Sequence, residues 1–135
     1  MMNDEAVELF SQEWCERAKA VWDDTVVPNL LVPEVISYVI EWGDIDSGAV
    51  CQTTCEGGKV LDWVAGKPHP DEECHFIFWG TRENWRKVGE GKLDPVAAVA
   101  SKRLHMRRGL MPVVIKEADA FKKLLVGFGR IPTAS

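Results

Sequence analysis

The stretch from residue 35 to residue 79 reads as short strands joined by turns, and this pattern constrains the fold most. Its β-branched and aromatic segments predict strands at 35–42, 49–55, 59–64 and 74–79. A turn rich in Asp, Ser and Gly separates the first two strands, Glu56-Gly57-Gly58 forms a hairpin turn before the third, and a polar loop precedes the fourth. Strands that follow one another through hairpins favour a largely antiparallel sheet.

Helical patterns lie on either side of this strand-rich stretch. Residues 4–24 carry apolar side chains at three- and four-residue steps, which predicts a first helix. Further helices are expected from Thr81 through Val88, after the Asp94–Pro95 pair, and from Pro112 onward, with a fifth strand at 102–108 and a frayed tail at 131–135. At 135 residues the chain has the length of one domain, and its predicted class is α+β.

The charge is unevenly distributed along the chain. The net charge is −5, yet residues 102–135 carry eight basic and only two acidic side chains. An acidic body argues against a nucleic-acid-binding protein, whose surface is usually strongly basic. The acidic start of the chain lacks the features of a secretory signal, so we expect a cytoplasmic protein with reduced cysteines.

Two groups of side chains contain metal-ligating residue types. Cys51 and Cys55 are four residues apart on a predicted strand, a separation of about 13 Å, so one zinc ion cannot reach both sulfurs. The loop from His69 to His75 holds acids and a cysteine after Pro68 and Pro70, which is typical of a solvated loop. We therefore predict neither a metal ion nor a cofactor, and no catalytic residue. A small metal-dependent enzyme that uses this loop stays the least favoured alternative.

The segment from Trp79 to Gly109 carries the most specific signal. Its string Gly91-Lys92-Leu93-Asp94-Pro95 follows Trp85 and precedes an alanine-bearing helix, a lysine–leucine pair at Lys102 and Leu104, and a glycine. This pattern resembles the sterol carrier protein type 2 family over residues 79–132, and over 35–78 by strand order. The chain departs from it in its six tryptophans and in its basic strand at 102–108.

The resemblance implies a single lipid-binding domain over residues 1–135. Its five-stranded, mainly antiparallel sheet would be covered by helices, with an apolar tunnel between the sheet and the helices. The expected lipid-binding residues are Trp85, Val88, Leu93, Val96, Val99, Leu104, Met106, Leu110, Met111, Phe121, Leu124, Leu125 and Phe128.

The function implied is a non-enzymatic carrier for a fatty acyl, sterol or other apolar lipid. The alternative is an accessory module that presents an apolar substrate to a partner enzyme. Arg103, Arg107 and Arg108 are candidates for a transient contact with an anionic membrane, because strand alternation puts Arg103 and Arg107 on the face opposite Leu104 and Met106. The sequence leaves open whether the protein is a monomer or a homodimer.

Overall fold

The computed structural model describes residues 5–23, 37–56, 59–116, 118, 122, 125 and 127–134. Within these residues one sheet has the order β3-β2-β1-β4-β5. Its strands are β1 (Ser37–Asp44), β2 (Val50–Glu56), β3 (Lys59–Ala65), β4 (Phe76–Gly80) and β5 (Leu104–Arg108). Only β1 and β4 pair in parallel, and the other neighbours pair antiparallel. The prediction of a five-stranded, mainly antiparallel sheet is confirmed, with one parallel pair at its centre.

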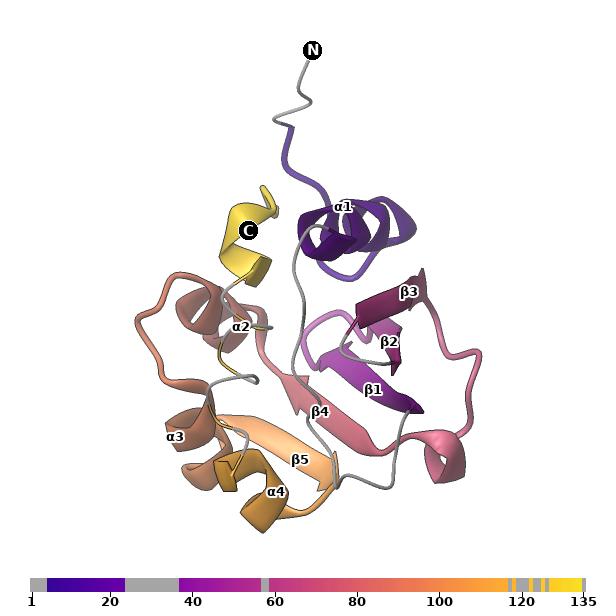
Figure 1. The fold of residues 1–135 in the computed structure, drawn as a ribbon. Helices are drawn as coiled ribbons and strands as arrows, with labels where there is room; N and C mark the ends of the chain where they lie inside the picture. Colours follow the sequence, from indigo (N-terminus) through magenta and orange to yellow (C-terminus); the bar gives the residue numbers. More distant parts are fainter. Residues whose placement is uncertain are drawn as a thin grey trace.

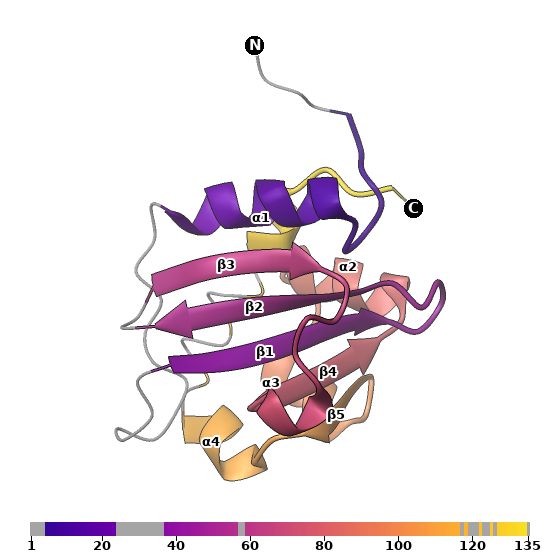
Figure 2. The ribbon, with the colours of Figure 1, turned by 90° about the vertical axis from the view of Figure 1, so that its right-hand side faces the viewer.

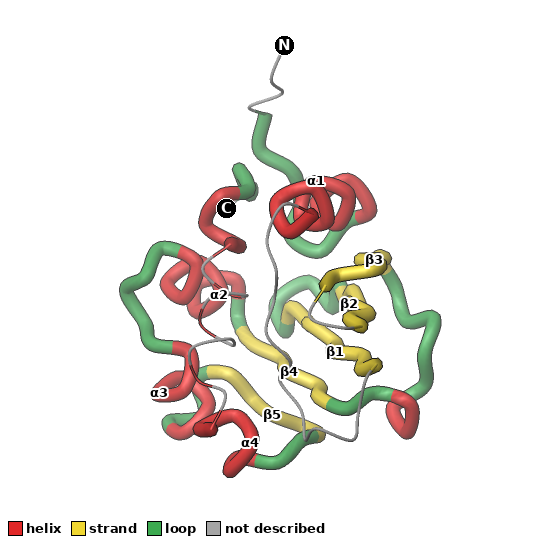
Figure 3. Tube along the Cα trace, in the orientation of Figure 1, coloured by secondary structure: helices red, strands yellow, loops and turns green. Residues whose placement is uncertain are grey.

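Helices cover one face of this sheet. They are α1 (Gln12–Asp23), α2 (Arg82–Gly89), α3 (Pro95–Ala100), α4 (Met111–Lys116) and the short 3-10 helix η2 (Gly127–Arg130). A second 3-10 helix, η1 (Asp71–Glu73), lies in the connection between β3 and β4. In Figures 1 and 3, α1 lies beside β3, whereas α3 and α4 lie near β5. Figure 2 shows the connection from β3 to β4, which contains η1, crossing the opposite face. The α+β class is therefore confirmed. None of the described helices combines the length and the hydropathy that a membrane span requires.

Local capping signals fix the starts of two helices. The Thr81 hydroxyl accepts the backbone N–H of Asn84 at 3.2 Å, and the Asp94 carboxylate accepts that of Ala97 at 3.0 Å. Each bond satisfies a backbone donor that the first turn of the helix would leave unpaired. Both predicted helix starts are confirmed.

The first helix begins later than predicted. It starts at Gln12 instead of residue 4, after Phe10, which has a left-handed φ of 62°. The hydroxyl of Ser11 then accepts the backbone N–H of Trp14 at 3.2 Å. Before residue 12 the chain instead passes through an isolated bridge at Val7 and a turn at Leu9 and Phe10, so the predicted start was wrong.

The C-terminal tail is held by the segment that precedes α1. The backbone N–H of Val7 donates to the carbonyl of Pro132 at 3.0 Å, and the N–H of Ala134 donates to the carbonyl of Val7 at 2.8 Å. The indole of Trp14 also donates to the hydroxyl of Thr133 at 3.1 Å. The prediction that residues 131–134 fray was wrong, because a distant part of the chain pairs with them.

Candidate functional site

Aromatic rings fill the space between α1, η2 and the strands β1 to β3. Phe128 lies at the centre of this cluster, with ring centroids 5.1–6.1 Å from its neighbours. Those neighbours are Phe10, Trp14, Trp42, Trp63 and Trp85. Edge-to-face contacts of this kind add to the stabilisation from burial. This cluster accounts for four of the six tryptophans as core residues.

Trp85 joins this aromatic cluster to the sheet. Its side chain is buried, and its Nε1–H donates to the carbonyl of Gly43 at 2.8 Å. The Nε1–H of Trp42 similarly donates to the hydroxyl of Thr53 at 2.8 Å. Buried indoles therefore keep a hydrogen-bond partner, which avoids the cost of an unpaired polar group.

A groove of about 700 Å³ opens between α3, β5 and the start of α4. Its apolar lining contains Val99, Leu104, Met106 and Met111, which the sequence predicted as lipid-binding residues, together with Ile45 and Ala100. Lys102, His105 and Arg107 complete the lining with basic side chains. Methionine side chains are flexible and adapt to ligands of different shapes. An apolar floor beside basic groups suits an amphipathic ligand.

A second pocket of about 530 Å³ lies against α2 and η2. Its lining includes Trp85 and Phe128 from the predicted set, and also Leu9, Ile131 and Arg82, which the sequence analysis missed. Leu9 and Ile131 come from the two paired ends of the chain, and no local sequence pattern reveals that pairing.

Arg82 in this pocket is held by two carboxylates. Its guanidinium contacts Asp44 at 2.8 Å and Glu8 at 2.7 Å. Burial works to raise the pKa of Asp44, but hydrogen bonds from Ser47, Arg82 and the backbone of Asp46 outweigh it, so this pKa lies below its ordinary value. Arg82 therefore anchors the β1–β2 turn to α2.

The other predicted lipid-binding residues occupy three kinds of position. Val88, Leu93 and Leu125 are buried in the main core, and Val96 packs against it half-buried. Leu110, in contrast, is 66% exposed. Phe121 and Leu124 lie outside the described residues. The structure therefore brings four of the predicted residues together in the groove and two in the second pocket, and these assignments to a lipid site stay predictions.

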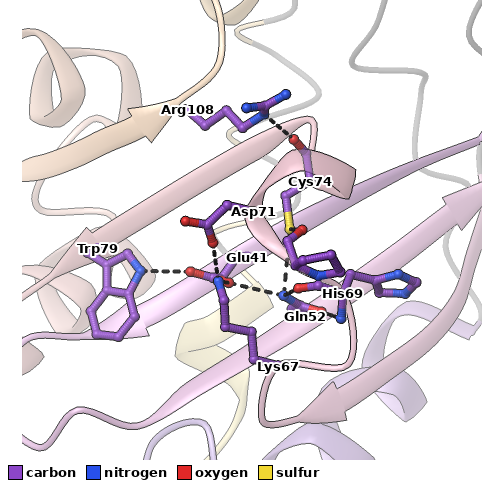
Figure 4. A network of polar contacts seen from close by, with 9 residues as sticks. Glu41, Gln52, Lys67, His69, Asp71, Cys74, Trp79 and Arg108 are labelled. Atoms are coloured by element: carbon purple, nitrogen blue, oxygen red, sulfur yellow. Dashed lines mark hydrogen bonds and ion pairs between the residues drawn. The ribbon is translucent and has the colours of Figure 1, made fainter.

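A polar network occupies the sheet face opposite the helices (Figure 4). At its centre is Glu41, only 1% exposed, which accepts hydrogen bonds from Gln52 at 3.0 Å and Trp79 at 2.9 Å. Lys67 bridges Glu41 and Asp71. Partial burial works to lower the pKa of Lys67, but the hydrogen bonds to these carboxylates outweigh it and raise that pKa.

This network holds the loop that contains His69 and His75. The Gln52 amide bonds both the N–H and the carbonyl of His69, each at 2.9 Å, and His75 Nδ1 accepts the N–H of Val39 at 3.1 Å. Among the described residues no group of three or more His, Cys, Asp or Glu side chains is placed to hold a metal ion. Asp71 and Glu73 pair with Lys67 and His69 inside this loop, and Lys67 joins the loop to the sheet through Glu41.

The four cysteines are buried as free thiols. Cys51 lies in the helix-covered core and accepts a hydrogen bond from the indole of Trp63 at 3.2 Å. Burial raises the pKa of the Cys51 thiol, and burial also raises that of Cys74. Thiols of this kind are inert, because the reactive form is the thiolate.

The predicted alternation of β5 is confirmed. Leu104 is buried and Met106 half-buried on the helix side, whereas His105 and Arg107 are exposed. The Arg107 guanidinium lies 4.5 Å from the ring centroid of Trp79, and Arg108 Nε donates to the carbonyl of Cys74 at 2.7 Å. The irregular pairing of β4 with β5 near Ile77 lets two successive arginines reach the same face.

Comparison with known proteins places this arrangement among solved structures. The sequence matches no known family profile and no curated protein. The fold does match: a crystal structure of sterol carrier protein 2 superposes with a TM-score of 0.74 at 16% identity, over 92% of this chain and 99% of the other. A conserved hypothetical protein from Thermus thermophilus, whose description suggests a sterol carrier protein, gives 0.71 at 17% identity, over 96% and 94%. The chain therefore has the sterol carrier protein 2 fold.

Proposed function

We propose that this protein is a non-enzymatic carrier of an apolar lipid. The observation that carries the proposal is the groove at β5, in which Val99, Leu104, Met106 and Met111 form an apolar lining. The shared fold with sterol carrier protein 2 supports the same assignment. We propose that the ligand enters by this groove and extends into a tunnel between the sheet and the helices. The buried free thiols are consistent with a cytoplasmic protein.

The affinity of such a site depends on the length of the ligand's hydrocarbon chain. Burial of one methylene is worth about 0.8 kcal/mol, so ten methylenes give about 8 kcal/mol before the cost of association is subtracted. A net free energy of about 8 kcal/mol corresponds to a dissociation constant near 1 μM, so a ligand must bury more than ten methylenes to offset the cost of association and reach that affinity. Long-chain fatty acids should therefore displace a fluorescent fatty-acid probe, and short-chain acids should not.

A bulky side chain in the groove tests the location of the site. Ala100 is exposed on α3 and lines the groove, and Ala97 is exposed on the same helix without lining it. We expect Ala100→Trp to weaken probe binding at least about tenfold, the effect of losing burial of about two methylenes. Ala97→Trp is the matched control and should bind as the wild type does.

Two results would contradict the proposal. The first is a saturating amount of probe that shows no change in fluorescence with the wild-type protein. The second is an equal effect of the two tryptophan variants, which would exclude the groove as the entry site. Mass spectrometry of an organic extract of the purified protein provides an independent check for bound lipid.

A further inference from the structure

We propose that the β5 edge and α4 form a surface that docks on an anionic lipid bilayer, and this rests on the proposed carrier function. Residues 102–116 contain five Lys or Arg and no Asp or Glu, in a chain with a net charge of −5. All five basic side chains are exposed. They are Lys102, Arg103, Arg107, Arg108 and Lys116. We call this segment, together with Ile45, the docking surface.

Three of these cations are available to an external partner. In the part of the chain that the structure describes, Lys102, Arg103 and Lys116 form no ion pair. The carboxylate of Asp71 lies within electrostatic range of Arg107 and Arg108 but is bound by Lys67. Among the described residues, therefore, no carboxylate pairs with these three cations, and they complement an anionic partner.

Exposed aliphatic side chains lie in the same region. Among the described residues four large hydrophobic side chains are exposed, and three of them belong to the docking surface: Ile45 at 43%, Leu110 at 66% and Ile115 at 57%. Leu110 directly precedes Met111 of the groove, and Ile115 follows Met111 by one helical turn, on the same side of α4. The fourth, Leu61, lies on β3 at the opposite edge of the sheet.

This combination fits a bilayer better than an acidic protein or a nucleic acid. Basic groups attract the anionic headgroups, and aliphatic side chains gain by entering the boundary between headgroups and acyl chains. The groove shares Ile45, Lys102 and Arg107 with the docking surface. Figure 3 shows α4 next to the edge strand β5. A docked protein would therefore present its groove to the membrane, where a lipid could pass between the two.

Vesicle co-sedimentation tests this docking surface. At low salt we expect the wild type to bind phosphatidylcholine vesicles that contain phosphatidylserine, and to bind pure phosphatidylcholine vesicles much less. Binding should weaken as salt rises, since the Debye length is only about 10 Å at 0.1 M. Arg103→Glu with Lys116→Glu should weaken binding at least about tenfold, because each basic residue near an anionic surface contributes substantially.

Two matched control variants separate loss of the docking surface from a general change in net charge or in exposed apolar area. Lys92→Glu with Arg130→Glu makes the same change in net charge at exposed positions outside the docking surface, and should keep most of the binding. Ile115→Ser should reduce binding about fivefold, whereas Leu61→Ser, at the opposite edge of the sheet, should not. Because none of these residues lines the groove, the fatty-acid probe should bind every variant in solution as it binds the wild type.

The outcomes distinguish failure of docking from failure of the carrier function. Equal binding of the wild type to both vesicle types, with normal probe binding, would overturn the docking surface and leave the carrier proposal intact. Loss of probe binding in the wild type would overturn the carrier function instead. If polyglutamate competes with the vesicles and Ile115→Ser has no effect, the surface recognises an acidic protein and the bilayer proposal is wrong.

Discussion

The indole ring of Trp79 lies directly against the Cα of Gly43 on the neighbouring parallel strand. A Cβ atom at residue 43 would lie 2.0 Å from the ring carbon Cδ2. The ring is also fixed by its hydrogen bond to Glu41 and by the Arg107 guanidinium above it. The absence of a side chain at Gly43 thus lets a tryptophan lie flat on the sheet face opposite the helices.

We expect Gly43→Ala to destabilise the fold by about 1–3 kcal/mol, the range for an overpacked site. The added methyl group must displace Trp79 and so weaken its bond to the buried Glu41. Chemical denaturation of Gly43→Ala, Trp79→Ala and the double variant measures the coupling. If the methyl group costs the same free energy with and without the Trp79 ring, the contact between the two residues is not its cause.

The sequence predicted those features of the fold that depend on local chemistry. Thr81 and the Asp94–Pro95 pair cap their helices as expected, because a cap involves only residues within one turn. The alternation of Leu104 and Met106 with exposed neighbours likewise follows from the period of a strand.

Features that depend on distant pairing were not predictable in this way. The parallel pairing of β1 with β4 follows from the path of the chain and not from the residues of either strand. The pairing of Val7 with Thr133 shortened the first helix and ordered the tail. Leu9 and Ile131, which lie close in sequence to the paired residues, both line the second pocket.

The candidate site was predicted only where its residues follow a local pattern. Strand alternation identified Leu104 and Met106 as groove residues, but Ile45, in a turn far away in sequence, gave no signal. Glu41 is a second residue whose surroundings no local pattern could predict. It lies in β1, but its ion pair with Lys67 comes from a loop that crosses the sheet, and no local pattern indicates that pairing.

His75 should make the stability of the protein depend on pH near neutrality. Its Nδ1 must be unprotonated to accept the N–H of Val39, and partial desolvation, followed by the nearby charge of Arg108, lowers its pKa. The unfolded chain then binds a proton more readily than the folded one, so stability falls as the pH drops below about 6.5. The decrease in stability that His75 causes ends once the pH drops below the lowered pKa of the folded state.

Denaturation curves of the wild type and His75→Asn between pH 5 and 7.5 measure this contribution. An asparagine carbonyl can still accept a hydrogen bond but does not titrate, so the variant should show a smaller slope of stability against pH in this range. His69→Asn makes the same substitution at another histidine of this loop and is the matched control. Identical slopes for the wild type and His75→Asn would show that protonation of this imidazole does not oppose folding.

Two substitutions of Trp85 test whether the aromatic cluster contributes to stability or to ligand binding. Trp85→Ala removes a buried ring that contacts Phe10, Trp42 and Phe128, and should cost about 3–5 kcal/mol of unfolding free energy. Trp85→Phe keeps a ring but leaves the Gly43 carbonyl without its indole donor, so a loss of about 1–3 kcal/mol is expected.

The same two variants are then compared for affinity of the fatty-acid probe, under conditions in which each is folded. Because the groove at β5 is lined by other residues, we expect the affinity of Trp85→Phe to stay close to that of the wild type. Trp85 and Phe128 do line the second pocket. A large loss of affinity in Trp85→Phe at nearly unchanged stability would therefore place the ligand in the second pocket, beside the paired ends of the chain, and not in the groove.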